Sequence, residues 1–174
     1  MTVYVRELEN DDIEPLLDLR ATVAAEGDKI GAEAPIDRDG DRRNLVTTYL
    51  DEGPGRMFVA EEEGRLVGSA GVSIRHGIAD VGMFVAASWR GRGLGSRLLE
   101  ACIEWAREQR AHKMTLQVWP HNRTAIALYE KYGFVREGYL RRHWRRRSGE
   151  LWDALIMGLV LEDRTESTEA RTNG

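Results

Sequence analysis

The residues best suited to do chemistry lie at positions 90–95, Arg-Gly-Arg-Gly-Leu-Gly. They separate a run typical of a β-strand, Ile78 to Ala86, from an amphipathic helical pattern, Leu94 to Glu108. Glycine lets the backbone pass close to a ligand. The N–H groups that begin a helix have no partner within it, and with the positive end of the helix dipole they bind anions. The pattern therefore predicts a turn that holds a phosphate group.

Two common phosphate sites do not match this spacing. A P-loop ends in Gly-Lys-Ser/Thr, whereas Gly95 is followed directly by Ser96. A dinucleotide fingerprint requires Gly-x-Gly-x-x-Gly, but the glycines here are spaced Gly-x-Gly-x-Gly. The next predicted strand, Lys113 to Trp119, also lacks an acidic residue for a ribose. A nucleotide hydrolase is disfavoured, and a dinucleotide-binding domain is the weaker alternative.

The third interpretation rests on a family resemblance. Arg90-x-x-Gly93-x-Gly95 resembles the Gln/Arg-x-x-Gly-x-Gly/Ala signature of the GNAT acetyltransferases, and residues 79–85 resemble the strand before it. Residues 122–134, Asn-Arg-Thr-Ala-Ile-Ala-Leu-Tyr-Glu-Lys-Tyr-Gly-Phe, are similar to the family's Asn-x-x-Ala-x-x-Leu-Tyr-x-x-x-Gly-Phe segment. The two motifs occur in the family's order and at its distance. The resemblance implies an N-acetyltransferase with acetyl-CoA as co-substrate.

By this resemblance, the turn binds the pyrophosphate of coenzyme A, and Arg90 is the first residue of the cofactor-binding signature. The expected donors are the backbone N–H groups of Arg92, Gly93, Leu94, Gly95 and Ser96. The amide-rich pantetheine arm is expected to pair with the backbone of Phe84 and Val85 in the manner of an added strand. Asn122 is expected to cap its helix and to contact the cofactor or an ordered water. Without a ligand, the turn is an ordinary glycine-rich entry to a helix.

Asp80 is the candidate general base. An attacking alkyl ammonium must lose a proton, and Asp80 occupies the position where many members of the family carry a glutamate. Strand alternation places it on the same face as Gly82 and Phe84. The alternative is a surface or salt-bridged aspartate. Because aspartate is shorter than glutamate, a relaying water also has room.

Tyr129 is the candidate general acid, since the family commonly supplies the proton for the departing thiolate from this segment. The alternative is a helix tyrosine that only packs on the sheet.

The resemblance covers Val3 to Leu161 and implies an α/β (α+β) fold, a mixed, mostly antiparallel sheet of six to seven strands flanked by helices. The cofactor is expected between two splayed strands, Ile78 to Val85 and Lys113 to Trp119. Residues 1–161 are predicted to form a single domain, followed by a polar, disordered tail at 162–174. Apolar periodicity predicts the other elements. Strands are expected at Val3–Val5, Met57–Glu61, Leu66–Ile74, Phe134–Trp144 and Leu151–Leu161, and helices from Asp11 or Asp12, over Asp41–Leu50 and over Ala125–Tyr132.

The resemblance implies that the acceptor is the amine of a small molecule or peptide, and that its pocket is formed by the first two helices, their loop and the last hairpin. Here these segments include an acidic loop at 26–40 and an arginine-rich hairpin at 141–147. An amino acid carries both charges and would match both segments, although each is also typical of solvated surface. A non-catalytic CoA-binding or ribosome-associated module that uses these arginines is the alternative function. The sequence leaves a homodimer open.

Composition excludes several classes of function. The 174 residues carry a net charge of −4, which disfavours general nucleic-acid binding. The four histidines have no metal-ligand spacing with each other or with Cys102, so no metal is expected. A single cysteine forms no intramolecular disulfide, and no apolar run approaches the length of a membrane span. We expect a cytoplasmic protein.

Overall fold

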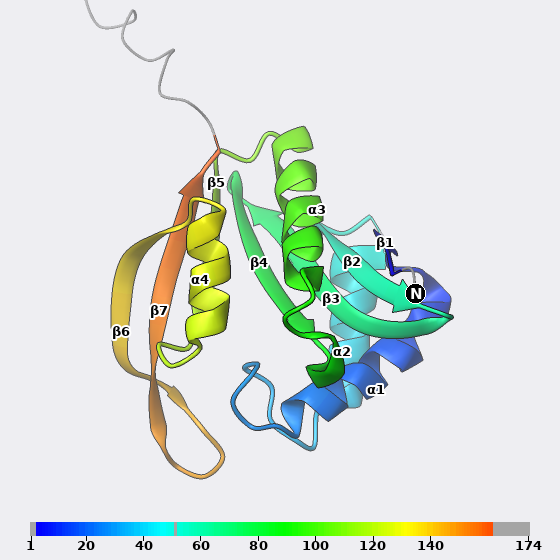
Figure 1. Cartoon of the computed structure of the whole chain (residues 1–174), viewed down its shortest axis with the longest axis horizontal. Helices are drawn as coiled ribbons and strands as arrows, with labels where there is room; N and C mark the ends of the chain where they lie inside the picture. The colour runs from blue at the N-terminus through cyan, green and yellow to red at the C-terminus, as the bar shows by residue number, and fades with distance from the viewer. Residues whose placement is uncertain (1–2, 51, 162–174) are drawn as a thin grey trace, which may run out of the picture.

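The computed structural model describes residues 3–50 and 52–161, which build one mixed sheet covered by helices on both faces (Figure 1). The strand order is β1-β2-β3-β4-β5-β7-β6, and every neighbouring pair is antiparallel except the parallel pair β4 and β5. The strands are β1 (Tyr4–Glu7), β2 (Gly55–Glu62), β3 (Arg65–Arg75), β4 (Ile78–Val85), β5 (Lys113–Val118), β6 (Val135–Arg145) and β7 (Leu151–Val160). This architecture confirms the predicted fold class, while the predicted tail at 162–174 lies outside the described residues.

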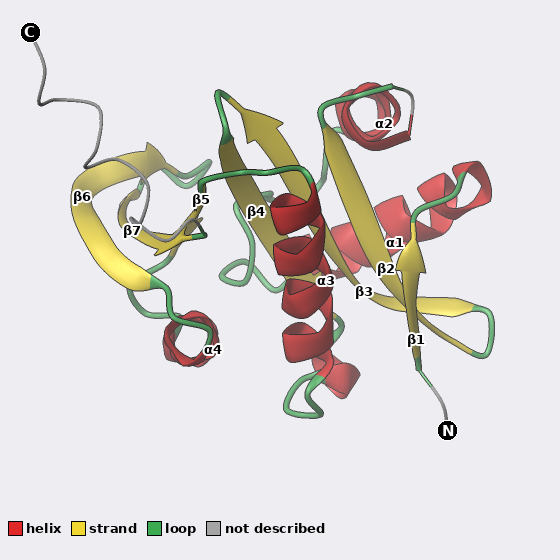
Figure 2. Ribbon diagram, turned by 90° about the horizontal axis from the view of Figure 1, so that it is seen from above, coloured by secondary structure: helices red, strands yellow, loops and turns green. Residues whose placement is uncertain are grey.

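The α-helices of the described chain form two layers, with α1 and α2 on one side of the sheet and α3 and α4 on the other (Figure 2). They are α1 (Ile13–Ala24), α2 (Arg38–Leu45), α3 (Leu94–Glu108) and α4 (Arg123–Lys131). Short 3-10 turns at Asn10–Asp12 and Ala87–Trp89 precede α1 and the glycine turn.

The larger core lies between α3, α4 and the sheet. Six residues of α3 at helical spacing are buried: Leu94, Leu98, Leu99, Cys102, Ile103 and Ala106. They pack against apolar residues of β3 and β4 that include Val72 and Val81. Burial of a Leu side chain contributes about 1.5–3 kcal/mol, so this stripe fixes the helix against the sheet. The predicted bounds of the helix, 94–108, are confirmed.

The second helix differs from its prediction, which began at Asp41. In the structure α2 begins at Arg38, because the carboxylate of Asp37 accepts a hydrogen bond from the N–H of Gly40 at 3.0 Å. The apolar residues that suggested a helix to Leu50 lie mostly in a wider π-helical turn, Val46–Leu50. The cap at Asp37 is a local polar signal, and a prediction from apolar periodicity alone does not take it into account.

The parallel pair β4 and β5 separates part-way along its length, as predicted. The two strands are paired at Ile78 with Lys113, Ala79 with Met114 and Asp80 with Thr115. Beyond Asp80, β4 stays paired with β3 alone, and beyond Thr115, β5 stays paired with β7 alone. Figure 1 shows the two strands diverging from this point. The strand edges that face the opening therefore leave backbone groups without a sheet partner.

Candidate active site

The glycine turn leads into α3 with its N–H groups available. Gly91 and Gly93 have φ of 73° and 77°, a left-handed conformation that favours glycine, and Gly93 is the N-cap of α3 without a side-chain cap. A Cβ at either position would meet no protein atom within 4 Å, so the glycines face open space. In the described chain, no other residue accepts a hydrogen bond from the backbone N–H groups of Arg92, Gly93, Leu94, Gly95 and Ser96. The turn has the free donors that a phosphate requires.

Gly95 has a different reason to be glycine. A Cβ there would lie 3.1 Å from Cδ2 of Leu128 on α4, so the absent side chain lets α3 and α4 pack closely. The side chain of Arg92 stacks on Trp89, with the guanidinium carbon 4.8 Å from the ring centroid.

The side chain of Arg90 binds protein groups. Its Nη1 and Nη2 donate to the carboxylate of Glu26 at 2.6 and 2.7 Å, and its Nε donates to the carbonyl of Val85 at 2.9 Å. These bonds join the residues after α1, the end of β4 and the turn. The Arg90 guanidinium also lowers the pKa of the Glu26 carboxyl through this hydrogen bond. Arg90 therefore holds the turn in place through its side chain.

Two further predicted cofactor contacts border the opening between β4 and β5. Phe84 and Val85 are paired with β3 on one side only, which leaves the other edge of the strand toward the opening. Asn122 caps α4, as predicted, since its Oδ1 accepts a hydrogen bond from the N–H of Ala125 at 3.2 Å. Its contact with a cofactor stays a prediction.

Asp80 lies at the point where the strands separate, in the last pair that joins β4 to β5. Its side chain shares a face with Gly82 and with Phe84, which packs against the core under α1 and α2. In the described chain it has no ion-pair or hydrogen-bond partner, so the salt-bridged alternative does not hold there. The residue is exposed, yet the surrounding protein displaces part of the hydration of its carboxyl and raises its pKa. A raised pKa makes this carboxylate a stronger base.

The surface beside Asp80 is open. A Cβ at Gly82 would meet nothing within 4 Å, whereas a Cβ at its strand partner Gly71 would lie 2.9 Å from the hydroxyl of Tyr49. Gly82 thus faces open space, whereas the place above Gly71 is filled by the side chains of Tyr49 and Met57. Burial raises the pKa of Tyr49, and the negative charge of Asp80 raises it further.

Tyr129 lies in the core under α3 and α4, on the face of the sheet opposite to Asp80. Its ring packs on Phe134 with centroids 5.7 Å apart, and burial raises its pKa to about 12. Among the described residues, its hydroxyl has no hydrogen-bond partner. The structure therefore places the two catalytic candidates on opposite faces of the sheet, and their catalytic roles stay predictions.

Comparison with known proteins decides the family. Residues 24–134 match the model of the acetyltransferase (GNAT) family. The chain belongs to this family. It is 30% identical over 168 residues to the L-amino acid N-acetyltransferase AaaT of Escherichia coli, which covers 91% of this chain and 98% of the relative. It is 25% identical over 168 residues to the L-methionine sulfoximine/L-methionine sulfone acetyltransferase of Pseudomonas aeruginosa, which covers 93% and 96%.

The fold of this GNAT acetyltransferase agrees with solved structures. A GNAT-family acetyltransferase from Streptococcus pneumoniae superimposes with a TM-score of 0.80 at 25% identity, covering 92% of this chain and all of that one. The protein is an N-acetyltransferase with acetyl-CoA as co-substrate. The free N–H groups at Arg92 to Ser96 and the unpaired edge of β4 fit this cofactor. The described residues contain no group of three or more His, Cys, Asp or Glu placed to hold a metal ion. They also contain no helix long and apolar enough to span a membrane.

The charged segments expected on either side of the acceptor contact each other. The carboxylate of Glu33 accepts hydrogen bonds from the backbone N–H of Arg147 at 3.1 Å and lies 3.7 Å from Nε of Arg146. The guanidinium of Arg146 is buried, donates to the carbonyls of Gly27 and Gly31, and lies over the rings of two tryptophans, Trp119 and Trp152. The loop after α1 is thereby attached to the β6–β7 hairpin. These charged residues stabilise the contact between the loop and the hairpin, which the sequence did not indicate.

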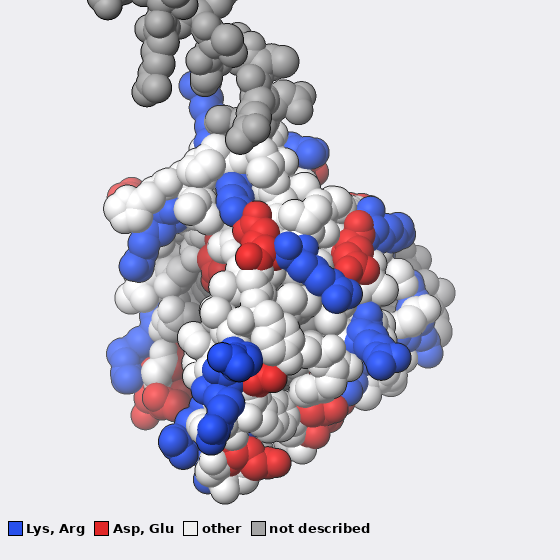
Figure 3. All heavy atoms as spheres, turned by 90° about the vertical axis from the view of Figure 1, so that its left-hand side faces the viewer, with Lys and Arg blue, Asp and Glu red and all other residues white. Residues whose placement is uncertain are grey.

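The outer face near β6 carries both signs of charge. Figure 3 shows basic and acidic side chains interspersed over this side of the molecule. Asp153 on β7 accepts hydrogen bonds from the hydroxyl of Tyr139 at 2.7 Å and from the N–H of Arg142 at 2.6 Å. The side chains of Arg146 and Arg147 also donate to acceptors on the loop after α1, and within the described residues this face differs from the uniform basic stripe typical of RNA-binding surfaces.

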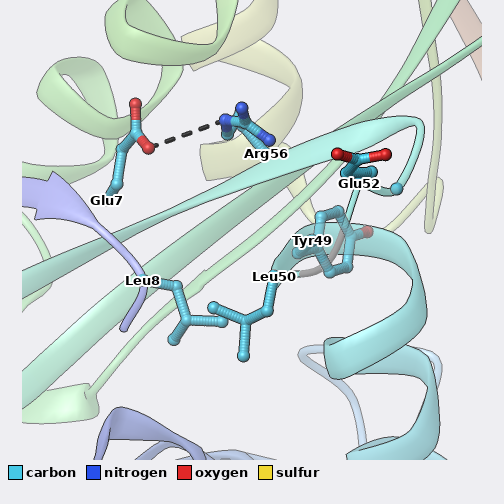
Figure 4. Close-up of a pocket in the computed structure, with 7 residues that line it drawn as sticks. Glu7, Leu8, Tyr49, Leu50, Glu52 and Arg56 are labelled. Atoms are coloured by element: carbon cyan, nitrogen blue, oxygen red, sulfur yellow. Dashed lines mark ion pairs between the residues drawn. The ribbon is translucent and has the colours of Figure 1, made fainter. Parts of the chain in front are cut away.

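An open pocket of about 690 Å³ lies beside the end of β1, away from the predicted site residues (Figure 4). It is lined by Glu7, Leu8, Tyr49, Leu50, Glu52, Gly53 and Arg56. Glu7 and Arg56 face each other across it at 3.6 Å. Tyr49, one of these lining residues, also has its hydroxyl close to Gly71 of β3.

One residue near Asp80, Tyr49, was missed by the sequence analysis. It lies in the segment expected only as a helix over Asp41–Leu50, and nothing local showed that its hydroxyl lies over β3.

Proposed function

We propose that the protein transfers the acetyl group of acetyl-CoA directly to the primary amine of a small molecule. The observation that carries this proposal is the place of Asp80, a carboxylate without a partner among the described residues, at the point where β4 and β5 separate. Two relatives that match nearly the whole chain are named for acetylating L-amino acids and for acetylating L-methionine sulfoximine and L-methionine sulfone. The open space over Gly82 leaves room for an acceptor beside Asp80.

Asp80 acts as the general base in this proposal. An alkyl ammonium with a pKa near 10.4 is neutral in well under about 1% of molecules at pH 7, so its proton must be removed before attack. Asp80 accepts that proton directly or through a water. Its raised pKa brings its proton affinity closer to that of the amine, which favours transfer.

Tyr129 acts as the general acid. Its hydroxyl is protonated at neutral pH, because burial raises its pKa to about 12. The same burial disfavours a thiolate beside it, so a departing sulfur there has a greater affinity for the proton. Before attack, Asp80 takes one proton from the ammonium and passes it to solvent. As the nitrogen–carbon bond forms and the carbon–sulfur bond breaks, Tyr129 gives its proton to the sulfur and the nitrogen loses its second proton to water, from which Tyr129 is reprotonated. The products are the amide, the CoA thiol and one proton in solvent.

The cofactor is held by backbone groups. The N–H groups of Arg92 to Ser96 bind the pyrophosphate, and the edge of β4 at Phe84 and Val85 binds the pantetheine arm. Arg90 contributes by fixing the carbonyl of Val85 and the turn, and Asn122 contributes by ordering the start of α4. When bound, acetyl-CoA supplies an acetyl thioester that is activated toward amines.

The proposal is tested by incubating the purified protein with acetyl-CoA and a panel of primary amines while the release of CoA thiol is measured. Amino acids, polyamines, amine antibiotics and peptides with free N-termini make up the panel. Thermal stabilisation by acetyl-CoA is recorded in parallel, since a ligand that binds only the folded state raises the melting temperature. Stabilisation without thiol release on any amine would contradict the proposed transfer.

A further inference from the structure

The side chain of Tyr49 lies across two strands of the sheet, over a glycine of each. A Cβ at Gly55 of β2 would lie 3.0 Å from Cδ1 of the ring, and a Cβ at Gly71 of β3 would lie 2.9 Å from the hydroxyl oxygen. Glycine inside a strand weakens the strand and marks a close approach by another group. These two glycines make room for the ring. The hydroxyl of Tyr49 therefore ends above β3, the direct neighbour of β4.

Gly82 of β4 lies on the same face, directly opposite Gly71. The Cβ positions of facing residues in an antiparallel pair are about 4.5–5.5 Å apart. The Tyr49 oxygen therefore lies within about 8 Å of the Cβ position of Gly82, yet more than 4 Å from it, because nothing lies within 4 Å of that position. An amine nitrogen above Gly82 fits into this gap at hydrogen-bond distance from the oxygen, about 2.7–3.2 Å.

Gly82 itself has no packing reason to be glycine. No protein atom opposes a side chain there, and its backbone has no left-handed φ. Glycine in a strand without such a reason is typical of a place where a ligand approaches closely. The free space over Gly82 is thus a binding position for a substrate group.

Two polar groups without partners border this position. Within the described ranges, neither the hydroxyl of Tyr49 nor the carboxylate of Asp80 has a hydrogen-bond partner. Asp80 is two residues from Gly82 along β4, on the same face, with its Cα about 6.6 Å away. Burial raises the pKa of Tyr49, so its hydroxyl is neutral at pH 7 and its oxygen accepts hydrogen bonds. The space over Gly82 therefore has one acceptor on the side of β3 and another along β4.

We propose that the hydroxyl oxygen of Tyr49 accepts one N–H of the acceptor amine over Gly82, so that Tyr49 positions the amine and selects primary over secondary amines. This inference rests on the proposed acetyl transfer to a small amine. A neutral primary amine has two N–H groups. One donates to Tyr49 and the other to Asp80 or to a water beside it, which leaves the nitrogen lone pair free to face the thioester. A secondary amine has a single N–H, so its alkyl group must lie against one of the two acceptors.

The test compares amines that differ only by a methyl group on nitrogen. Methionine is paired with N-methylmethionine and benzylamine with N-methylbenzylamine, and the most reactive amine of the panel is paired with its own N-methyl derivative. The value of kcat/KM is measured for each by thiol release in the wild type and in Tyr49→Phe, which keeps the ring over Gly55 and Gly71. Tyr4→Phe is the matched control, because Tyr4 is 62% exposed on β1.

The wild type should prefer each reactive primary amine over its N-methyl derivative by at least about 10-fold, since the derivative leaves an acceptor of the site without its donor. In Tyr49→Phe, kcat/KM should fall roughly 3- to 10-fold for the primary amine and by less than about twofold for the N-methyl derivative, so the preference shrinks. The KM for acetyl-CoA should not change, and Tyr4→Phe should keep the full preference. The ratio of two substrates in one preparation does not depend on the fraction of enzyme that is folded, so a loss of stability cannot imitate this result.

Two outcomes overturn the inference and are distinct from failure of the proposed function. Equal kcat/KM for primary and N-methyl amines in the wild type, or an undiminished ratio in Tyr49→Phe, removes Tyr49 from amine binding while acetyl transfer itself stands. Absence of thiol release with every amine, while acetyl-CoA still raises the melting temperature, contradicts both.

Discussion

Asp80 and Thr115 form the last pair that joins β4 to β5. The carboxylate therefore lies where the sheet opens, held by paired backbone on one side and facing an unpaired edge on the other. A regular parallel pair would have continued toward Val85 and closed the opening. The site thus depends on an interruption of strand pairing more than on any single side chain.

The first prediction concerns the base. Asp80→Asn should lower kcat/KM for the amine by roughly 100- to 10,000-fold. In the wild type, log kcat/KM falls with decreasing pH, and the slope of this fall should become steeper below the pKa of Asp80, since only the carboxylate accepts a proton. Because burial raises that pKa, the steepening begins at a higher pH than for an ordinary aspartate. Titration of the amine substrate at alkaline pH affects the wild type and Asp80→Asn equally, so it does not account for a difference between their pH profiles. A variant that keeps most of the activity and the same profile would exclude Asp80 as the base.

The second prediction uses the same variant but measures stability. A raised pKa means that the folded protein holds the proton of Asp80 more tightly than the unfolded chain does, so ionisation at neutral pH disfavours folding. This cost is present above the folded pKa and absent below the unfolded one. Asp80→Asn should therefore melt at a higher temperature than the wild type at pH 7, and the difference should shrink toward about pH 3.5. An unchanged or lower melting temperature at pH 7 would contradict the desolvation of this carboxyl.

The third prediction separates catalysis from packing at Tyr129. Tyr129→Phe removes a hydroxyl without a described protein partner and keeps the ring on Phe134, so the free energy of unfolding should change by less than about 1 kcal/mol. The value of kcat should fall roughly 10- to 1,000-fold with the KM for acetyl-CoA unchanged. Tyr132→Phe is the control, since that hydroxyl donates to Glu100 on the surface. Equal kcat in wild type and Tyr129→Phe would leave Tyr129 a core residue.

The fourth prediction concerns the contact between loop and hairpin. Arg146→Met should lower the free energy of unfolding by about 2–4 kcal/mol, because it leaves the carbonyls of Gly27 and Gly31 without their donor and removes the cation between Trp119 and Trp152. Urea unfolding measures this loss. Arg145→Met, at an exposed neighbouring position, should change it by less than about 0.5 kcal/mol. Similar effects of the two changes would show that the buried arginine does not stabilise the fold.

Local signals explain why much of the fold could be predicted. The six-residue apolar stripe of α3, the cap at Asn122 and the glycine turn each lie within a short stretch of sequence, and each was found correctly. The ion pair between Arg90 and Glu26 joins residues 64 positions apart, and no local pattern encodes it. Charges at 26–40 and 141–147 were interpreted as a substrate site because sequence shows sign but not pairing.

The fifth prediction tests where the acceptor binds. Gly82→Ala adds a methyl group that meets no protein atom within 4 Å, and the residue has an ordinary strand conformation, so the fold should not change. If the amine lies over Gly82, that methyl group displaces it and kcat/KM for the amine should fall roughly 10- to 100-fold. Thermal stabilisation by acetyl-CoA should persist, because the turn at Arg92 to Ser96 is untouched. Gly138→Ala is the control, because Gly138 lies in the edge strand β6, where a Cβ makes only ordinary contacts. It should leave both kcat/KM and the stabilisation by acetyl-CoA unchanged. The new methyl group meets no described protein atom, so lost turnover in a stable Gly82→Ala enzyme would mean that the methyl group clashes with the substrate. Full turnover would show that the amine does not bind over Gly82.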